Sequence, residues 1–345
     1  MKRYFHNLIT GERRVAFGPI LRPFLLFASL LFFLAAKVRF FLYKSGVFCC
    51  KKLPVPVISV GNITWGGTGK TPLVEAILLW LNAARLSPVL LTRGYGNDED
   101  KMVSSRFPNV FVLSGKRRLR NALNYLKTAH AGVFILDDGF QHLGISRDID
   151  IVTVSAVSPF GNSRLIPAGS LREPISALKR ADIIVLTKAD LVTDKQLSRI
   201  SRFVRAASNG ALIFYARHVP VSLKISGIRE KGLEYIKGKQ VICVSALADN
   251  RSFVKTVENL GATCVDSFSY IDHHLYTGCD VDRILQASKR RGVDIVLTTE
   301  KDWVKLAPLT AKPGIGGIEF TVLRVELKIT EEEVFYGRLS ALFHS

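Results

Sequence analysis

An apolar segment runs directly into a glycine-rich loop between residues 57 and 71. Val57–Val60 is a short hydrophobic run, and residues 61–71 read Gly-Asn-Ile-Thr-Trp-Gly-Gly-Thr-Gly-Lys-Thr. Glycines let successive backbone N–H groups converge on anionic oxygens, the lysine can reach outer phosphates, and the last hydroxyl can ligate Mg²⁺. The amphipathic run Leu73–Ala84 follows, so a helix N-terminus would lie behind the phosphates. The sequence therefore predicts a nucleoside triphosphate site.

The residues predicted to bind the nucleotide all lie in this loop. They are Gly61, Asn62, Thr64, Gly66, Gly67, Thr68, Gly69, Lys70 and Thr71. Thr64 departs from the common pattern, which has glycine five residues before Gly69, and the Gly66-Gly67 pair can supply the lost flexibility. The alternative is a glycine-rich turn that binds nothing. The strand–loop–helix setting favours the phosphate site.

The composition of the chain limits its partners. Hydrophobic residues make up 48% of the 345 residues, which excludes a disordered chain. The net charge of +19 calls for an anionic partner, and nucleic acid, an anionic membrane and a phosphorylated substrate all qualify. The 5 cysteines are an odd number without C-x-x-C spacing, which argues against a disulfide framework or a zinc site and fits a reducing cytoplasm.

An uncharged apolar segment covers residues 23–36, and cations flank it: Arg13, Arg14, Arg22, Lys37, Arg39 and Lys44. As a helix this segment would reach about 21 Å, short of the roughly 30 Å hydrocarbon core, so a membrane span is disfavoured. A signal peptide is one alternative, but export would take a nucleotide loop to a compartment without ATP. A buried core helix is weakened by the flanking cations. We expect an uncleaved helix in the membrane interface, held on anionic lipid by its basic flanks.

Strands and helices alternate after the first loop. Strands are expected at 89–92, 110–113, 133–136, 149–154 and 183–186, with a helix near 118–127. Alternation of this kind predicts a parallel sheet with helices on both faces and ligands at the carboxyl ends of the strands. One strand closes on Asp137-Asp138-Gly139, where an acidic group can hold Mg²⁺; an ordinary turn is the alternative.

The chain changes character near Gly210. Long strands at 211–225 and 318–329 are expected to form an antiparallel linker, and the strands and helices between them suggest a smaller α/β domain. The predicted domains are a membrane-associated segment (1–52), a P-loop core (53–215), the smaller domain with its linker strands (216–329) and a C-terminal helix that returns to the core (330–345).

A set of further motifs is more specific. They are Thr92-Arg93-Gly94-Tyr95-Gly96, Asp137 to His142, Pro167 to Pro174, Asp272-His273-His274 and Thr298 to Asp302. Together with the glycine-rich loop and the apolar start, their order resembles the tetraacyldisaccharide 4′-kinases, also called lipid A 4′-kinases. That family phosphorylates a glucosamine disaccharide lipid on the cytoplasmic face of the bacterial inner membrane.

The resemblance implies a P-loop NTPase-like fold, ATP and Mg²⁺ as cofactors, a disaccharide 1-phosphate lipid as substrate and an anionic membrane surface as partner, with no nucleic acid and a monomer favoured. The roles that it implies are catalysis by Asp98, His273 and Lys70, phosphate contacts from Arg118 and Arg172, and metal binding by Thr71, Asp137, Asp138 and Glu173. The chain departs from the family after Gly96, where a longer segment ending in Gly-Asp-Glu-Pro is usual and this chain has only Asn97–Asp100. Asp98 is the best match to the catalytic base, and an exposed acidic turn is the alternative.

A GTPase is the rival function. Thr187-Lys188-Ala189-Asp190 follows an apolar strand and resembles the guanine-reading element of GTPases. An ordinary strand–loop connection is the favoured interpretation of this match. A basic membrane or nucleic-acid adaptor would account for the charge but not for the paired carboxylates. Phosphoryl transfer from ATP or from GTP distinguishes the kinase from the GTPase.

Overall fold

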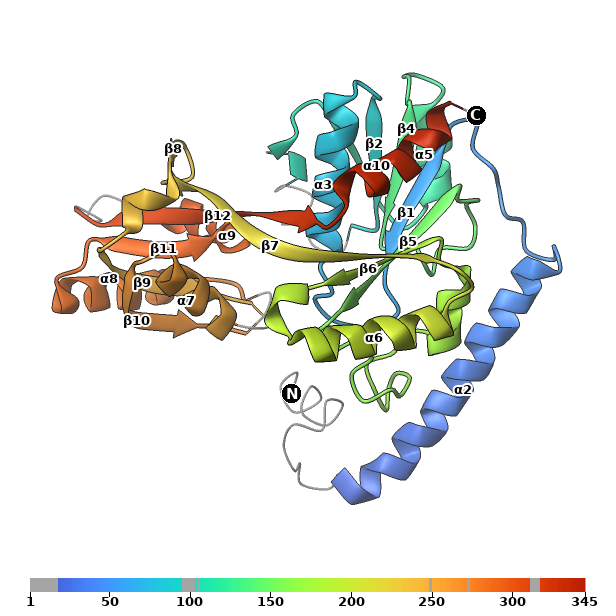
Figure 1. Ribbon diagram of the computed structural model, residues 1–345, viewed down its shortest axis with the longest axis horizontal. Helices are drawn as coiled ribbons and strands as arrows, with labels where there is room; N and C mark the ends of the chain where they lie inside the picture. Colours follow the sequence, from blue (N-terminus) through green and yellow to red (C-terminus); the bar gives the residue numbers. More distant parts are fainter. Residues whose placement is uncertain are drawn as a thin grey trace. The chain divides into compact units, whose positions relative to one another are not determined.

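The computed structural model describes residues 18–94, 103–104, 106–247, 250–271, 274–310 and 317–344, and Figure 1 shows the chain as a ribbon. The chain divides into two compact units. Unit 1 consists of Met1–Tyr95, Phe107–Arg217 and Leu327–Ser345, and unit 2 of Gly96–Arg106 and His218–Glu326. Unit 2 is therefore an insertion within the sequence of unit 1.

Unit 1 contains a parallel sheet in the order β7-β6-β5-β1-β4-β2-β3. Its strands are β1 (Val57–Gly61), β2 (Pro88–Thr92), β3 (Phe111–Ser114), β4 (Val133–Asp137), β5 (Ile149–Ser155), β6 (Ile183–Thr187) and the first part of β7 (Leu212–Ile225). Its helices are α2 (Gly18–Lys44), α3 (Lys70–Ala83), α5 (Arg118–Tyr125), η1 (Ile175–Arg180), η2 (Ala189–Leu191), α6 (Asp194–Ala207), α10 (Glu332–Ser340) and η4 (Ala341–Phe343).

Helices cover both faces of this sheet, as the sequence predicts. Ala122 of α5 packs with strand residues such as Phe134, and Val204 of α6 packs with Val152. The strand register places Phe134 and Val152 on one face, because side chains alternate along each strand. Phe214 of β7 points to the other face. It contacts Phe335 of α10, and the neighbouring Tyr336 stacks on Trp80 of α3 with ring centroids 5.2 Å apart. Thus α3 and α10 occupy the opposite face from α5 and α6.

Unit 2 is a smaller α/β structure with the strand order β10-β9-β11-β12-β7, and β8 pairs with β7. Its elements are β8 (Arg229–Lys231), η3 (Leu233–Ile236), β9 (Gln240–Ser245), α7 (Asn250–Asn259), β10 (Thr263–Ser269), α8 (Gly278–Arg291), β11 (Ile295–Thr299), α9 (Glu300–Thr310) and β12 (Glu319–Ile329). Helices α8 and α9 pack with Val244 and Val296, whereas α7 packs with Cys243 and Leu297. The helices of unit 2 therefore also lie on both faces of its strands.

Two long strands, β7 and β12, carry the chain into and out of unit 2. They are neighbours in the sheet. The amide of Thr330 donates to the carbonyl of Tyr215 (2.8 Å), and the amide of Ser226 donates to the carbonyl of Phe320 (2.7 Å). Because the residue numbers rise on one strand as they fall on the other, the strands are antiparallel, as expected for the linker.

Helix α2 is longer than the apolar run suggests. It comprises 27 residues, Gly18–Lys44, and is long and apolar enough by length and composition to cross a membrane. At 1.5 Å per residue it measures about 40 Å. The expectation of a short helix is wrong, because Lys37 and Arg39 interrupt the apolar run without ending the helix, and Val38 and residues 40–43 continue it. Length alone therefore does not exclude a span.

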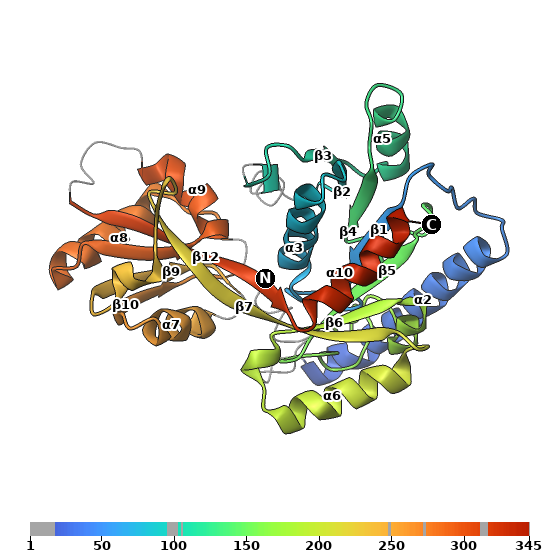
Figure 2. The ribbon, with the colours of Figure 1, turned by 45° about the horizontal axis from the view of Figure 1, so that its top comes forward.

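Helix α2 is hydrogen-bonded to the rest of unit 1 at two places along its length. Ser29 Oγ donates to the carbonyl of Leu165 (2.8 Å) and accepts from the amide of Ala168 (3.0 Å). Farther along the helix, Arg39 Nη2 donates to the carbonyl of Gln141 (3.2 Å). Figures 1 and 2 show the straight course of the helix from two directions. A helix held at both of these points lies along unit 1.

Candidate active site

The glycine-rich loop connects β1 to α3 at the carboxyl edge of the parallel sheet. Gly69 precedes the helix with a φ of 82°, in the left-handed region that favours glycine. A Cβ at Gly61 would collide with the backbone and Cβ of Phe140, so only glycine lets β1 approach the turn after β4. Trp65, Gly66 and Gly67 are exposed. The loop is thus open to solvent at its tip and closely packed at its base.

Buried hydroxyl and amide groups hold the base of the loop. Asn62 Nδ2 donates to the carbonyl of Thr64 (2.6 Å) and to Thr68 Oγ1 (2.9 Å). Thr68 Oγ1 also shares a hydrogen bond with Thr153 Oγ1 on β5 (2.8 Å). Thr187 Oγ1, at the end of β6, donates to the carbonyl of Thr68 (2.8 Å). These contacts fix the loop conformation before any ligand arrives.

The first part of the loop is also joined to the segment that carries Arg172 and Glu173. The amide of Trp65 donates to the carbonyl of Ser170 (2.6 Å), and the amide of Arg172 donates to the carbonyl of Ile63 (2.8 Å). Thr64 and Leu171 form an antiparallel bridge between these two bonds. The backbone thereby brings Arg172 beside the phosphate loop, although the two motifs are far apart in the sequence.

Asp138 lies at the centre of a cluster of cations. Lys70 Nζ is 3.5 Å from Asp138 Oδ1, and Arg172 Nη1 is 2.8 Å from both carboxylate oxygens. Arg118, on α5, is buried and donates through Nη1 to the carbonyl of Asp138 (3.2 Å). Lys70, Arg118, Arg172 and Asp138, four of the residues that the sequence singles out, are therefore brought together.

Charge and burial shift the pKa values of Asp138 and Arg118 in opposite directions. Burial would raise the pKa of Asp138, but Lys70 and Arg172 outweigh it and hold the pKa below its usual value. Burial lowers the pKa of Arg118 despite the opposing charges of Asp137 and Asp138. Asp138 also adopts a φ of 49°, a conformation that aspartate tolerates better than most residues. An ionised carboxylate is thus held in a specific orientation among cations that a phosphate could share.

Glu173 is held by different partners. Arg180 Nη2 lies 2.8 Å from Glu173 Oε2, and Gln141 Nε2 donates to Glu173 Oε1 (3.0 Å). The same nitrogen of Gln141 also donates to the carbonyl of Asn62 (2.8 Å). Both carboxylate oxygens of Glu173 are therefore oriented, and one of them is connected to the phosphate loop through Gln141.

The residues predicted to bind metal are Thr71, Asp137, Asp138 and Glu173. Among the described residues no group of three or more His, Cys, Asp or Glu side chains is arranged to hold a metal ion by itself. Mg²⁺ in phosphate sites usually takes one or two carboxylates together with phosphate oxygens and water. A threonine hydroxyl that opens α3 and carboxylates at the end of β4 are hard oxygen donors of this type. The donor set fits Mg²⁺ bound together with a nucleotide.

The predicted catalytic base Asp98 and its partner His273 lie outside the described residues. The neighbouring His274 lies within the described residues, and its side chain packs against aromatic rings and a helix cap. Its ring stacks on Tyr270 at 4.3 Å between centroids and lies edge-on to Tyr276. His274 Nε2 is 3.2 Å from Asp280 Oδ2, and Asp280 caps α8 through Thr277. These contacts fix the backbone directly after His273.

His142 follows the aspartate motif and is surrounded by positive charge. Burial, and then Arg118 and Arg147, lower its pKa from 6.5 to about 4. The imidazole is therefore neutral near pH 7. Its Nε2 is buried and makes no hydrogen bond within the described part of the chain.

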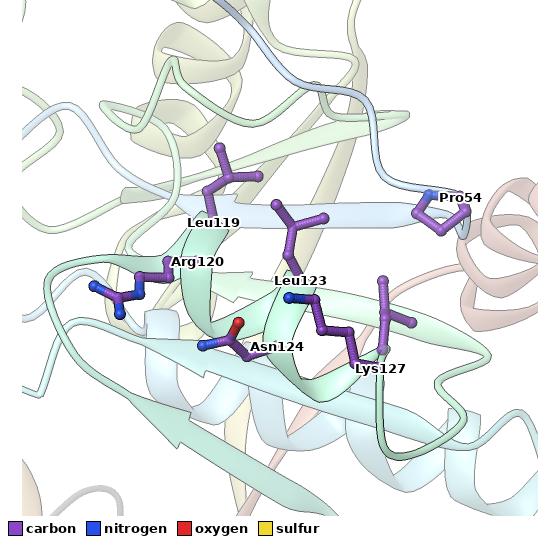
Figure 3. Close-up of a pocket in the computed structure, with 7 residues that line it drawn as sticks. Pro54, Leu119, Arg120, Leu123, Asn124 and Lys127 are labelled. Carbon is purple, nitrogen blue, oxygen red and sulfur yellow. The ribbon is translucent and has the colours of Figure 1, made fainter.

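A shallow depression on α5 does not coincide with this site. Figure 3 shows it, and its lining residues are Pro54, Leu119, Arg120, Leu123, Asn124, Leu126 and Lys127. No residue of the phosphate loop lines it. The depression is therefore separate from the predicted phosphate site.

Sequence reasoning missed several residues that shape the site. Gln141 and Arg180 orient Glu173, and Thr153 supports the loop. Gln141 lies within the motif Asp137 to His142, and its position there is a signal for a role in the site. Thr187 was assigned to a possible guanine-reading element, but its hydroxyl contacts the phosphate loop. Nothing in the sequence near Arg180 indicates its role.

Comparison with known proteins identifies the family. Residues 21–105 and 97–344 match the family described as LpxK, tetraacyldisaccharide-1-P 4′-kinase. The chain belongs to this family. A tetraacyldisaccharide 4′-kinase of Anaeromyxobacter dehalogenans is 35% identical, with 92% of this chain and 89% of the relative covered. A probable mitochondrial tetraacyldisaccharide 4′-kinase of Arabidopsis thaliana is 37% identical over 81% and 80% of the two chains.

A solved member of the family has the same fold. LpxK from Aquifex aeolicus, solved in complex with ATP, is 30% identical in sequence to this chain. The structural match covers 94% of this chain and 99% of the Aquifex chain, with a TM-score of 0.73. The P-loop fold expected for the kinase family is therefore confirmed over nearly the whole chain.

Proposed function

We propose that this protein is a lipid kinase that transfers the γ-phosphoryl group of ATP to the 4′-hydroxyl of a tetraacyl glucosamine disaccharide 1-phosphate, a late step of lipid A biosynthesis. Membership of the tetraacyldisaccharide 4′-kinase family supports the reaction. The geometric observation that carries it is the cluster of Lys70, Arg172 and Asp138 at the phosphate loop. Cations oriented there by a carboxylate suit a transferring phosphoryl group, whose negative charge is spread over several oxygens.

The nucleotide site can be assigned residue by residue. We propose that the amides of residues 66–70 and the side chain of Lys70 bind the β- and γ-phosphates of ATP at the N-terminus of α3. Arg172 and Arg118 add positive charge around the reacting group. Asp138 holds Lys70 and Arg172 in place until the phosphates share those cations.

Mg²⁺ is proposed to bind through Thr71, Asp138 and Glu173, with Asp137 beside them. It would neutralise charge on the outer phosphate oxygens. The residues of the chain position these donors: α3 presents Thr71, the end of β4 presents the two aspartates, and Arg180 with Gln141 orient Glu173.

Asp98 and His273 are proposed to act together on the acceptor. As the 4′-oxygen forms its bond to phosphorus and the bond to the β-phosphate oxygen breaks, the hydroxyl proton passes to Asp98, and ADP leaves. His273 would orient or relay that proton. If the two residues act as one unit, the double alanine variant should turn over little more slowly than either single variant. Losses that multiply would contradict the pair.

The membrane is the proposed surface on which the reaction takes place. Helix α2 exposes large apolar side chains away from its contacts with unit 1: Phe24, Leu26, Phe27, Leu30, Leu31, Leu34, Val38 and Phe41. A helix that is hydrogen-bonded to the rest of unit 1 at Ser29 and Arg39 and exposes this surface suits a monotopic attachment. We propose the cytoplasmic face of the bacterial inner membrane, where ATP is present, and a monomeric enzyme that binds no nucleic acid. We also propose residues 1–52, 53–215, 216–329 and 330–345 as its functional segments.

The direct test is an assay with the purified full chain in detergent. Disaccharide 1-phosphate lipid and labelled ATP should give a product whose new phosphate is at the 4′ position by mass spectrometry. The same lipid already phosphorylated at 4′ is the matched control and should gain no label. Absence of product with a folded enzyme would exclude the proposed reaction. Substituting GTP for ATP tests the rival GTPase, which predicts hydrolysis of GTP without lipid.

A further inference from the structure

The guanidinium group of Arg180 contacts two aromatic rings from different parts of unit 1. Its Cζ is 4.3 Å from the ring centroid of Phe140, in the turn after Asp138, and 5.1 Å from that of Phe40 on helix α2. The same guanidinium pairs with Glu173 at 2.8 Å. Arg180 therefore contacts both the membrane-associated helix and a carboxylate of the proposed metal site.

A second contact connects α2 to the same place. Arg39 Nη2 donates to the carbonyl of Gln141, and the side chain of Gln141 donates to Glu173 and to the carbonyl of Asn62. Adjacent residues on α2 thus support both partners of Glu173: Phe40 packs on Arg180, and Arg39 holds the backbone of Gln141.

We propose that Arg180 is a positioning residue that makes the orientation of Glu173 depend on the docking of helix α2. It acts through Glu173 and is not itself a catalytic residue. The inference rests on the proposed role of Glu173 toward Mg²⁺. It adds a function for α2, because the helix proposed to bind the lipid surface would also orient a carboxylate of the nucleotide site.

The physical basis is the environment of the guanidinium. A cation on an aromatic face gains more from the contact when it is shielded from water. The side chains of Arg180 and Glu173 are only 19% and 14% exposed. Removing the ring of Phe40 would admit water to one face of the guanidinium, so Arg180 and the carboxylate would lose their fixed orientation. A lysine in place of Arg180 would keep the charge but not this orientation, because lysine lacks the planar group that packs on aromatic rings and pairs with a carboxylate.

The chain offers a matched control next to Phe40. Phe41 lies on the same helix, but its side chain is 65% exposed. Phe40→Ala and Phe41→Ala remove the same ring from adjacent positions. Only the first should disturb Glu173, whereas both reduce the apolar surface of α2.

The experiment measures nucleotide binding by the full chain in detergent, without lipid. A fluorescent ATP analogue is titrated with Mg²⁺ and, separately, with EDTA, and the ratio of the two affinities reports the metal contribution. We expect Arg180→Ala to lower that ratio about 10- to 100-fold, the usual effect of losing a group that orients a metal ligand. Phe40→Ala should lower it on the order of fivefold, as a partly shielded cation–π contact predicts. Arg180→Lys should rescue little, and Phe41→Ala should leave the ratio unchanged.

A double-mutant cycle with Glu173→Gln separates the inference from the role on which it rests. If Arg180 acts through Glu173, Arg180→Ala should have no further effect in the Glu173→Gln background. An equal effect in both backgrounds, or equal losses in Phe40→Ala and Phe41→Ala, would overturn the inference. If Glu173→Gln alone leaves both the affinity ratio and turnover unchanged, the proposed metal role of Glu173 is wrong.

Discussion

Two aspartates near the carboxyl ends of parallel strands have opposite environments. Asp138 follows β4 and is surrounded by Lys70, Arg172 and Arg118. Asp302, in the first turn of α9 after β11, is fully buried. Its Oδ2 accepts from the hydroxyl of Thr299 (2.7 Å) and from the amide of Ala246 (3.0 Å). One carboxylate is balanced by cations, and the other accepts hydrogen bonds through Oδ2 from neutral donors.

The difference shows how to separate a site residue from a structural one. Cations that balance a carboxylate can also bind an incoming phosphate, so we expect Asp138 to exchange partners when ATP binds. The donors of Asp302 belong to the backbone and to a neighbouring side chain, so exchanging them would disrupt the fold. Position at the end of a strand does not distinguish these roles, but the chemistry of the partners does.

The largest expected effect is on turnover at the cation cluster. Lys70→Ala and Asp138→Asn should each reduce kcat/KM for ATP roughly 10²–10³-fold, as for other groups that stabilise charge in a transition state. Asparagine keeps the shape of Asp138 and its tolerance of positive φ, so the loss reports the charge. Steady-state kinetics measures the effect, and a urea titration checks that the fold is intact. Near wild-type turnover in folded Lys70→Ala would refute the phosphate-loop assignment.

The second effect is on stability, at the other aspartate. Asp302→Ala should lower the free energy of unfolding by about 2–4 kcal/mol, because the amide of Ala246 and the hydroxyl of Thr299 lose a buried acceptor. Asp302→Asn is the matched control, since it keeps one acceptor oxygen and should lose less. Urea unfolding measures both. A stable Asp302→Ala protein with reduced turnover would mean that the comparison of the two aspartates is wrong.

A smaller effect should appear in the pH dependence of stability. The pKa of His142 is about 4 in the folded chain, against 6.5 for an unperturbed histidine. Between these values the unfolded chain binds the extra proton, so stability falls as the pH falls from 6.5 to about 4 and is unaffected by this group above 6.5. His142→Gln should flatten the plot of unfolding free energy against pH between 6.5 and 4, as measured by urea unfolding at each pH. A profile that stays equally steep between pH 6.5 and 4 in His142→Gln would contradict this assignment.

The smallest effect is expected at a third aspartate beyond a strand. Asp190 follows β6 in the motif that resembles a guanine-reading element, and its side chain is exposed. Asp190→Asn should change kcat/KM for ATP by no more than about twofold, as for most surface substitutions. Competition between ATP and GTP provides the measurement. A strong change in base preference would give this motif a role in nucleotide recognition.

The sequence predicted the fold well where the pattern is local. Strand β4 runs one residue beyond the expected stretch, and β5 and β6 do the same. Helix α6 was not predicted, although Thr193 and Gln196 form a capping box at its start. The bounds of α2 were wrong because two cations in a long apolar helix resembled its end.

The site was predictable only in part, because motifs show residue types but not partners. The cluster at Asp138 follows from motifs at the ends of adjacent strands and their nearby loops. The pairing of residues 63–65 with 170–172 has no sequence signal, since it consists of backbone hydrogen bonds between distant loops. The contact of Phe40 with Arg180 could not be predicted either, because it depends on where an apolar helix docks.

The position of helix α10 in the sequence has a consequence for protein synthesis. Phe335 of α10 is fully buried, and Tyr336 beside it covers Trp80, so residues that are synthesised after unit 2 close this face of unit 1. Until then a nascent chain exposes Trp80 and Phe214, with the whole of unit 2 already made. Premature termination near residue 330 would therefore release a chain with an open apolar face, a substrate for chaperones and proteases rather than a shortened enzyme.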